Sequence, residues 1–225
     1  MIERPVYMSE LETFRDDREH VKVLTGIRRC GKSTLLIQFM QRLKTEGASD
    51  SEMLLLNLES ADYDDIVDHS DLNAYLKDKI PKTGRFYLFL DEIQRVKDWE
   101  RTVNALMVDT EADIYITGSN AHLLSTDLST YLTGRYVEIK MIPLSFKEYV
   151  ELRGNGRRTE DVFKEYFEFG GFPGINPILG KQAISTMLDD LYASIVFRDM
   201  VSRGKVRKPE ELEKMVTYLM LNIGN

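Results

Sequence analysis

The sequence lacks the features that mark a secreted or membrane protein. It contains one cysteine, Cys30, among 225 residues, so no internal disulfide can form. No apolar run approaches the roughly 20 residues that a membrane-spanning helix requires, and the first residues carry no apolar secretory core. A lone cysteine suits a reducing compartment. These absences predict a cytoplasmic protein with no membrane partner.

The sequence also lacks an excess of positive charge. The chain has 30 lysines and arginines against 37 aspartates and glutamates, a net charge of -7, whereas a domain whose main partner is nucleic acid is usually basic. The histidines, His20, His69 and His122, are too scattered for a metal site. The length suffices for one α/β core and a smaller second unit.

Short apolar runs alternate with segments whose apolar residues recur at helical spacing. The predicted strands cover 21–25, 53–58, 86–90, 114–117 and 136–139, and the helical patterns between them cover 33–44, 71–80 and 99–108. This alternation predicts an α/β fold with a doubly wound, mainly parallel, five-stranded sheet.

The pattern changes near Pro143. Beyond it we find no strand pattern, residues 145–148 match a helix capping box, and helical patterns cover 160–169, 181–198 and 209–221. We therefore expect two units, residues 1–142 with the sheet and residues 143–225 as a small helical unit.

One motif carries most of the chemistry. Residues 26–33, Gly-Ile-Arg-Arg-Cys-Gly-Lys-Ser, match the phosphate-binding loop G-x-x-x-x-G-K-[ST] at every position, between a strand pattern and a helix pattern. The glycines let backbone amides approach an anion, and the helix start adds its positive dipole end. We expect Lys32 to bind the β- and γ-phosphates and Ser33 to bind Mg²⁺. The residues expected to contact the nucleotide are Gly26, Ile27, Arg28, Arg29, Cys30, Gly31, Lys32, Ser33 and Thr34.

An acidic pair, Asp91 and Glu92, follows the apolar run 86–90 directly. In open α/β sheets, ligands bind beyond the carboxyl ends of the strands. We expect Asp91 to hold Mg²⁺ and Glu92 to orient or deprotonate the attacking water. The alternative is that acidic residues simply end a buried strand in solvent.

Three further polar residues are weaker candidates. Ser119 and Asn120 follow the strand 114–117 and compete for a role in sensing the γ-phosphate or positioning water, with a plain turn as the alternative. Arg135 precedes the fifth strand and is a candidate for the positive charge that stabilises phosphoryl transfer. A surface arginine or a salt bridge is the alternative, and action on its own nucleotide or a neighbour's stays open.

These pieces together resemble the prokaryotic AAA-type ATPases that carry a C-terminal domain of unknown function, DUF4143. The segments that carry the resemblance are 25–35, 57–59, 90–94, 117–119, 132–135, 143–149, 170–173 and 197–199. The resemblance implies a P-loop NTPase sheet of order 5-1-4-3-2 with a helical unit behind it. It also implies the roles given above for Lys32, Ser33, Asp91 and Glu92, while Arg135 matches the family's Gly-Arg position.

The same family usually continues into a winged-helix-like segment and a nuclease-like C-terminal domain. The chain stops where that segment is expected to begin, near Leu221. We therefore expect a truncated chain, and nucleic acid as a partner only through the missing region.

The leading expectation is an ATPase that couples hydrolysis of Mg-ATP to a conformational switch, regulatory or DNA-associated. A small-molecule kinase is one alternative, although the glutamate directly after Asp91 favours activation of water. A nucleotide-binding module that docks a partner without turnover is another. A GTPase is less favoured, because no Asn-Lys-x-Asp motif occurs. An unidentified protein partner or self-association is compatible with the sequence, which names neither.

Overall fold

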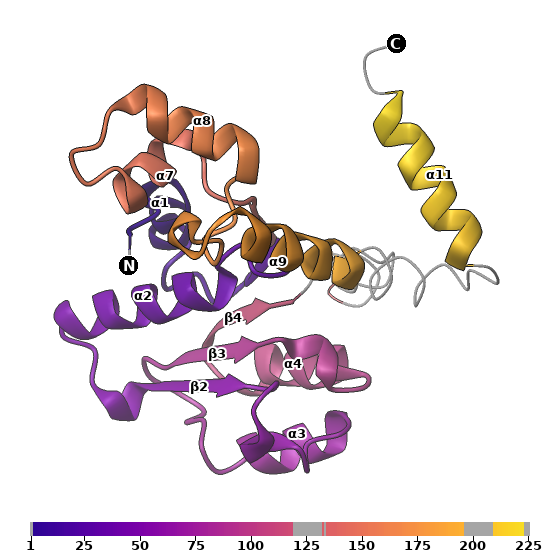
Figure 1. The fold of residues 1–225 in the computed structure, drawn as a ribbon. Coiled ribbons are helices and arrows are strands. Elements are labelled where there is room, and N and C mark those ends of the chain that lie inside the picture. The colour runs from indigo at the N-terminus through magenta and orange to yellow at the C-terminus, as the bar shows by residue number, and fades with distance from the viewer. Residues whose placement is uncertain (1, 119–131, 133, 196–208, 223–225) are drawn as a thin grey trace.

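The computed structural model describes residues 2–118, 132, 134–195 and 209–222. Its strands are β1 (Val21–Gly26), β2 (Met53–Asn57), β3 (Tyr87–Asp91), β4 (Asp113–Thr117) and β5 (Tyr136–Met141). They form one sheet of order β2-β3-β4-β1-β5, and every neighbouring pair is parallel. This is the expected order 5-1-4-3-2 counted from the other side of the sheet, so the predicted fold class is confirmed. Figure 1 shows β2, β3 and β4 side by side.

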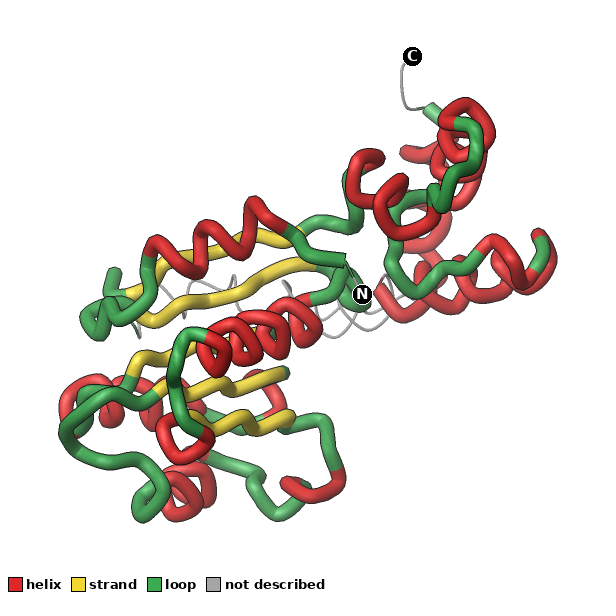
Figure 2. Tube along the Cα trace, turned by 90° about the vertical axis from the view of Figure 1, so that its left-hand side faces the viewer, coloured by secondary structure: helices red, strands yellow, loops and turns green. Residues whose placement is uncertain are grey.

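Helices cover both faces of the sheet (Figure 2). One core lies between the sheet and the helices α3 (His69–Leu76) and α4 (Trp99–Asp109), and the other lies between the sheet and α1 (Pro5–Thr13) and α2 (Lys32–Thr45). Side chains alternate along β1, with Val21 and Val23 in the first core and Leu24 in the second. All residues of β1, β3 and β4 are buried, as uninterrupted apolar runs of a parallel sheet require.

The remaining helices follow the sheet. Among the described residues they are α7 (Phe146–Arg153), α8 (Thr159–Phe169), α9 (Lys181–Ala193) and α11 (Pro209–Leu221). The predicted capping box of α7 is confirmed, because the Ser145 hydroxyl accepts from the Glu148 amide while the Glu148 carboxylate accepts from the Ser145 amide. Among the described residues, no helix has the length and apolar character needed to cross a bilayer.

The segments 143–149 and 170–173, both part of the family resemblance, contact each other after the end of β5. The Leu144 amide donates to the Gly171 carbonyl oxygen at 2.7 Å, and a Cβ at position 171 would lie 2.2 Å from the Leu144 carbonyl oxygen. Glycine is therefore required where the segment after α8 packs on the segment before α7. The division near residue 143 itself stays a prediction.

The helix α1 was not predicted from the sequence. Only Met8 and Leu11 on it are buried, so it shows no broad apolar stripe, and its N-cap residue Arg4 makes no side-chain capping bond. Proline at its first position was the available sign of a helix start.

Candidate functional site

The phosphate loop connects the end of β1 to the start of α2. Gly26 has a φ of 150°, and a Cβ there would lie 2.4 Å from the Met141 carbonyl oxygen, so only glycine fits. Gly31 caps α2 in the left-handed region, with a φ of 105°. None of the described side chains caps this helix end, and its first turn holds no acidic residue. No described side chain therefore occupies the first amides of α2 as a cap, and they can bind an anion.

Lys32 is the first residue of α2, and only 4% of it is exposed. Its Nζ donates to the carbonyl oxygens of Gly26 at 3.1 Å and Ile27 at 3.3 Å, so the ammonium group folds back over the loop. Cys30 is fully buried beside it, and burial raises the pKa of its thiol. A protonated, buried thiol is a packing group and not a reactive one.

A cluster of oxygen atoms joins the loop to the ends of two strands. The Ser33 hydroxyl donates to Asp91 Oδ1 at 3.0 Å, and the Thr117 hydroxyl donates to the same oxygen. The Glu92 amide in turn donates to the Thr117 hydroxyl oxygen at 3.1 Å. Asp91 ends β3 and Thr117 ends β4, so the carboxyl ends of both strands meet the start of α2 here.

Thr117 was read from the sequence only as the end of a strand. Leu90 pairs with Ile116 in the parallel register, so the next residue of each strand, Asp91 and Thr117, lies at the same level. Polar residues at equivalent ends of neighbouring strands were the sign that sequence reasoning could have used.

Glu92 adopts a conformation that non-glycine residues avoid. Its φ is 55° and its ψ is 45°, in the left-handed region, which costs about 1–2 kcal/mol for a residue with a Cβ. Its carboxylate accepts a hydrogen bond from the Gln94 amide group. Arg29 in the phosphate loop has a similar φ of 62°. Such outliers cluster at functional sites, because only the surrounding structure holds them in place.

A pocket of about 390 Å³ opens beside the phosphate loop. Its walls come from the N-terminal segment, the loop, α2, the end of α7 and the turn after α8. Residues that line it include Ile2, Arg4, Gly31, Thr34, Gln38, Leu152, Arg153 and Pro173. The mixture of apolar walls and a few polar groups is typical of small-molecule sites.

Comparison with known proteins identifies the fold family. The model of the AAA domain family AAA_14 matches residues 18–150, more than half of the chain. The chain belongs to this AAA domain family. Nucleotide binding of the ATPase type is the general function that membership carries.

Two curated relatives of this AAA domain are similar over most or all of it. A protein of Haemophilus influenzae is 38% identical over 229 residues, which cover 100% of this chain and 56% of the relative. A protein of Methanocaldococcus jannaschii is 30% identical over 213 residues, which cover 90% and 46%. Both are named uncharacterized protein, and this chain spans about half of their length.

Solved structures with the same fold include two of Hsp104. A closed-state reconstruction with ATPγS and FITC-casein has a TM-score of 0.52 at 16% identity, covering 88% of this chain and 38% of that one. A Saccharomyces cerevisiae Hsp104–casein complex has a TM-score of 0.53 at 18% identity, covering 89% and 39%. At these identities, the similarity shows the fold alone.

The AAA domain brings together most of the expected site residues. The carboxyl ends of the strands, here called the carboxyl edge of the sheet, hold the loop residues, Lys32, Ser33, Asp91 and Glu92. Ser119 and Asn120 lie outside the described residues, so their roles stay predictions.

Arg135 lies at the amino ends of the strands, here called the amino edge of the sheet. Its carbonyl oxygen accepts from the Val21 amide at the start of β1, and its guanidinium donates to Asn104 of α4 at 3.4 Å. The length of β1, at about 3.3 Å per residue, separates this end from the phosphate loop. The structure therefore does not bring Arg135 to the nucleotide site of its own chain.

The oxygen cluster fits Mg²⁺ held together with a nucleotide. Mg²⁺ binds hard oxygen atoms, and in nucleotide sites it takes one or two protein ligands while phosphates and water supply the rest. The Ser33 hydroxyl and the Asp91 carboxylate, 3.0 Å apart, offer such a pair. Within the described part of the chain, no group of three or more His, Cys, Asp or Glu side chains forms a separate metal cage.

Proposed function

We propose that this AAA domain binds ATP with Mg²⁺ and hydrolyses the γ-phosphate bond to drive a conformational switch in the cytoplasm. The observation that carries the proposal is the 3.0 Å hydrogen bond from Ser33 to Asp91. It joins the phosphate loop and the strand end that bears Glu92 into one site, which each motif alone would not require.

Each group has a defined task in this proposal. The amides of the loop and the Lys32 ammonium bind the β- and γ-phosphates, and the pocket beside Gly31 takes the nucleoside. Ser33 and Asp91 hold Mg²⁺, which neutralises charge on the phosphates. Glu92 orients the attacking water and accepts its proton. Because the Thr117 hydroxyl bonds both Asp91 and the Glu92 amide, it fixes the metal ligand and the base relative to one another.

Two variants separate binding from hydrolysis. We expect Lys32→Ala to weaken ATP affinity by about 100-fold or more in calorimetry, because a buried charge-assisted contact is lost. We expect Glu92→Gln to keep the affinity and to lower phosphate release by about 10²–10⁴-fold, the usual contribution of a general base. Unchanged ATP affinity in Lys32→Ala would overturn the proposal.

The matched control is Glu111→Gln. The exposed Glu111 carboxylate lies away from the phosphate loop and pairs with Arg18 at 2.8 Å. It should leave both affinity and turnover unchanged. Bound ATP whose γ-phosphate stays intact in the wild type would favour a docking module. ADP that forms only with an added metabolite would favour a kinase.

Arg135 is proposed to act on the nucleotide of a second copy of the chain. Its distance from its own phosphate loop and its exposed position support this. Arg135→Ala and Lys32→Ala would then each be inactive alone but partly active when mixed, because one supplies the loop and the other the arginine. A mixture as inactive as its components would contradict self-association through this residue.

The expected association with DNA is a separate question, because the chain carries a net charge of -7 and contacts to DNA phosphates need basic side chains. Titration of duplex DNA across a salt series tests it, because phosphate contacts must weaken as salt rises. Affinity that does not depend on salt would exclude a backbone-binding role.

A further inference from the structure

One buried arginine connects the phosphate loop to the first helix of the helical region. Arg4 precedes α1, and only 5% of it is exposed. A guanidinium has five N–H donors, and Arg4 uses all of them. Its contacts are Nε to Glu148 Oε1 at 2.9 Å, Nη2 to Glu148 Oε2 at 3.1 Å and to Pro143 O at 3.4 Å, and Nη1 to Cys30 O at 3.2 Å and to Ile142 O at 2.9 Å.

The contact with Cys30 acts on the phosphate loop. Because a peptide group is planar, holding the Cys30 carbonyl oxygen also fixes the direction of the Gly31 amide that follows it. Gly31 is the N-cap of α2, where a phosphate is proposed to bind. A rotation of this peptide on phosphate binding must therefore change the hydrogen bond to Arg4.

The contact with Glu148 acts on α7. The Glu148 carboxylate also accepts from the Ser145 amide and hydroxyl, both at 2.8 Å, and so holds the first turn of the helix. Tyr149 of α7 packs against Tyr166 of α8, with ring centroids 5.2 Å apart. A shift of Glu148 is therefore passed to both helices, α7 and α8.

We propose that Arg4 is a positioning residue that couples nucleotide on the phosphate loop to the placement of α7 and α8. The proposal rests on the proposed function and adds the route by which occupancy of the site reaches the helical region. The fork of the guanidinium explains the choice of arginine, because it bonds a carboxylate in bidentate fashion while its remaining N–H groups hold backbone carbonyls. Coupling is reciprocal, so displaced α7 and α8 must also weaken nucleotide binding.

Hydrogen exchange over residues 145–169, with and without Mg-ATP, measures the coupling. In the wild type we expect ATP to change exchange there by about fivefold or more, the lower end of typical coupling between sites. In Glu148→Gln we expect the change to fall below about twofold and ATP affinity in calorimetry to weaken by the lost factor. Arg4→Lys should lose the ATP-dependent change in exchange as Glu148→Gln does, because a single ammonium group cannot donate to the carboxylate and to the loop carbonyl together. If Arg4→Lys does not fold, the result for Glu148→Gln alone tests the coupling.

The matched control is Glu165→Gln. The Glu165 carboxylate accepts from the Tyr149 hydroxyl and from Arg157, each at 2.8 Å, entirely within the helical region. This variant should keep the full ATP-dependent change. If Glu148→Gln also keeps it, the coupling role of Arg4 is wrong. If wild-type ATP binding leaves exchange at 145–169 unchanged, the inference fails and the proposed function stands, whereas no ATP binding at all overturns the proposed function as well.

Discussion

The amino and carboxyl edges of the sheet differ in the partners of their charged side chains. At the carboxyl edge, the Lys32 ammonium donates to two backbone carbonyl oxygens, and Glu92 adopts a left-handed backbone conformation. At the amino edge, Lys22 and Asp113 form a buried ion pair with 0% and 3% of their side chains exposed. Asp113 also accepts from the Tyr115 hydroxyl at 2.7 Å and the Asp16 amide at 2.9 Å.

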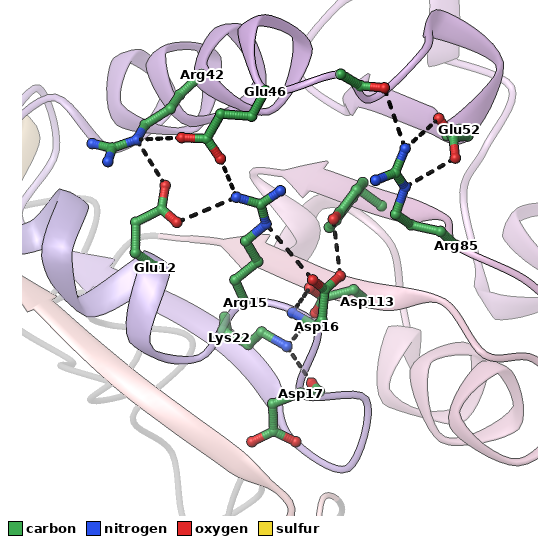
Figure 3. A network of polar contacts seen from close by, with 12 residues as sticks. Glu12, Arg15, Asp16, Asp17, Lys22, Arg42, Glu46, Glu52, Arg85 and Asp113 are labelled. Atoms are coloured by element: carbon green, nitrogen blue, oxygen red, sulfur yellow. Dashed lines mark hydrogen bonds and ion pairs between the residues drawn. The ribbon is translucent and has the colours of Figure 1, made fainter.

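The amino edge is tied into a wider network (Figure 3). Arg15 pairs with Glu12 and Glu46, which links α1 to the end of α2. The Tyr87 hydroxyl donates to Asp16 at 2.8 Å, which links the network to β3. Charges at this edge are paired within the chain, whereas at the carboxyl edge the Lys32 ammonium and the first amides of α2 are available to a ligand. The comparison predicts that substitutions at the amino edge change stability and that substitutions at the carboxyl edge change binding or turnover.

The largest expected effect is at the amino edge. Lys22→Met should lower the free energy of unfolding by about 3–5 kcal/mol, because it leaves the Asp113 carboxylate buried without its cation. Denaturant unfolding measures this, and ATP affinity should not change once the protein is folded. Burial already raises the pKa of Asp113 against the opposing effect of Lys22. The deficit should therefore shrink as the pH falls and Asp113 takes up a proton.

The control for that variant is Arg18→Met. Arg18 and Glu111 also pair at 2.8 Å, but their side chains are 40% and 46% exposed. Such a surface pair contributes about 1 kcal/mol or less. Equal losses in the two variants would show that burial is not what makes the amino edge stable.

The next effect tests the close packing under the phosphate loop. Gly26→Ala should cost about 2–3 kcal/mol of stability and weaken ATP binding, because the new methyl group meets the Met141 carbonyl oxygen and the loop must shift. Gly84→Ala is the matched control, since Gly84 has a φ of 98° but no atom within 4 Å of the added Cβ. It should cost only the strain of the left-handed backbone, about 1–2 kcal/mol, with ATP binding intact.

A smaller effect separates strain from catalysis at the carboxyl edge. Glu92→Gly should raise the free energy of unfolding by about 1 kcal/mol, because glycine adopts a φ of 55° without penalty. Phosphate release should be lost at the same time. Asp98→Gly is the control, because Asp98 has a φ of 53° at the start of α4 and makes no capping bond. It should gain similar stability with turnover unchanged, and a loss of stability in Glu92→Gly would show that its conformation is not strained.

The parts predicted correctly from the sequence are those with local patterns. The β-rich run 21–25 and the apolar runs 86–90 and 114–117 located β1, β3 and β4, and the glycines with Lys32 located the turn from β1 into α2. Thr117 and Arg4 were missed for a physical reason. The acceptors of Arg4 lie up to 144 residues away in the chain, and three of them are backbone carbonyls that any residue carries. Arg135 was a candidate by motif, but its edge of the sheet follows only from the parallel register.

The smallest expected effect concerns pH and distinguishes the buried carboxylate of Asp113 from the partly buried carboxylate of Glu148. Burial alone would raise the pKa of Glu148, but hydrogen bonds from Arg4 and Ser145 outweigh it, so the pKa lies below its ordinary 4.5. Glu148 therefore stabilises the fold above about pH 4.5, and this contribution is lost as the pH falls through its folded pKa. Asp113 has the opposite sign, because a raised pKa favours the folded state at low pH.

Unfolding free energies between pH 7 and pH 3 test both signs. Glu148→Gln should lower stability by about 1 kcal/mol at neutral pH, because the glutamine oxygen still accepts from Arg4, and the difference from the wild type should shrink as the pH falls through the folded pKa of Glu148. Asp113→Asn should instead make the acid-induced loss steeper than in the wild type. Parallel pH profiles for the two variants would mean that both carboxylates are held alike. The difference between Asp113 at the amino edge and Glu148, which Arg4 links to the phosphate loop, would then not extend to their protonation.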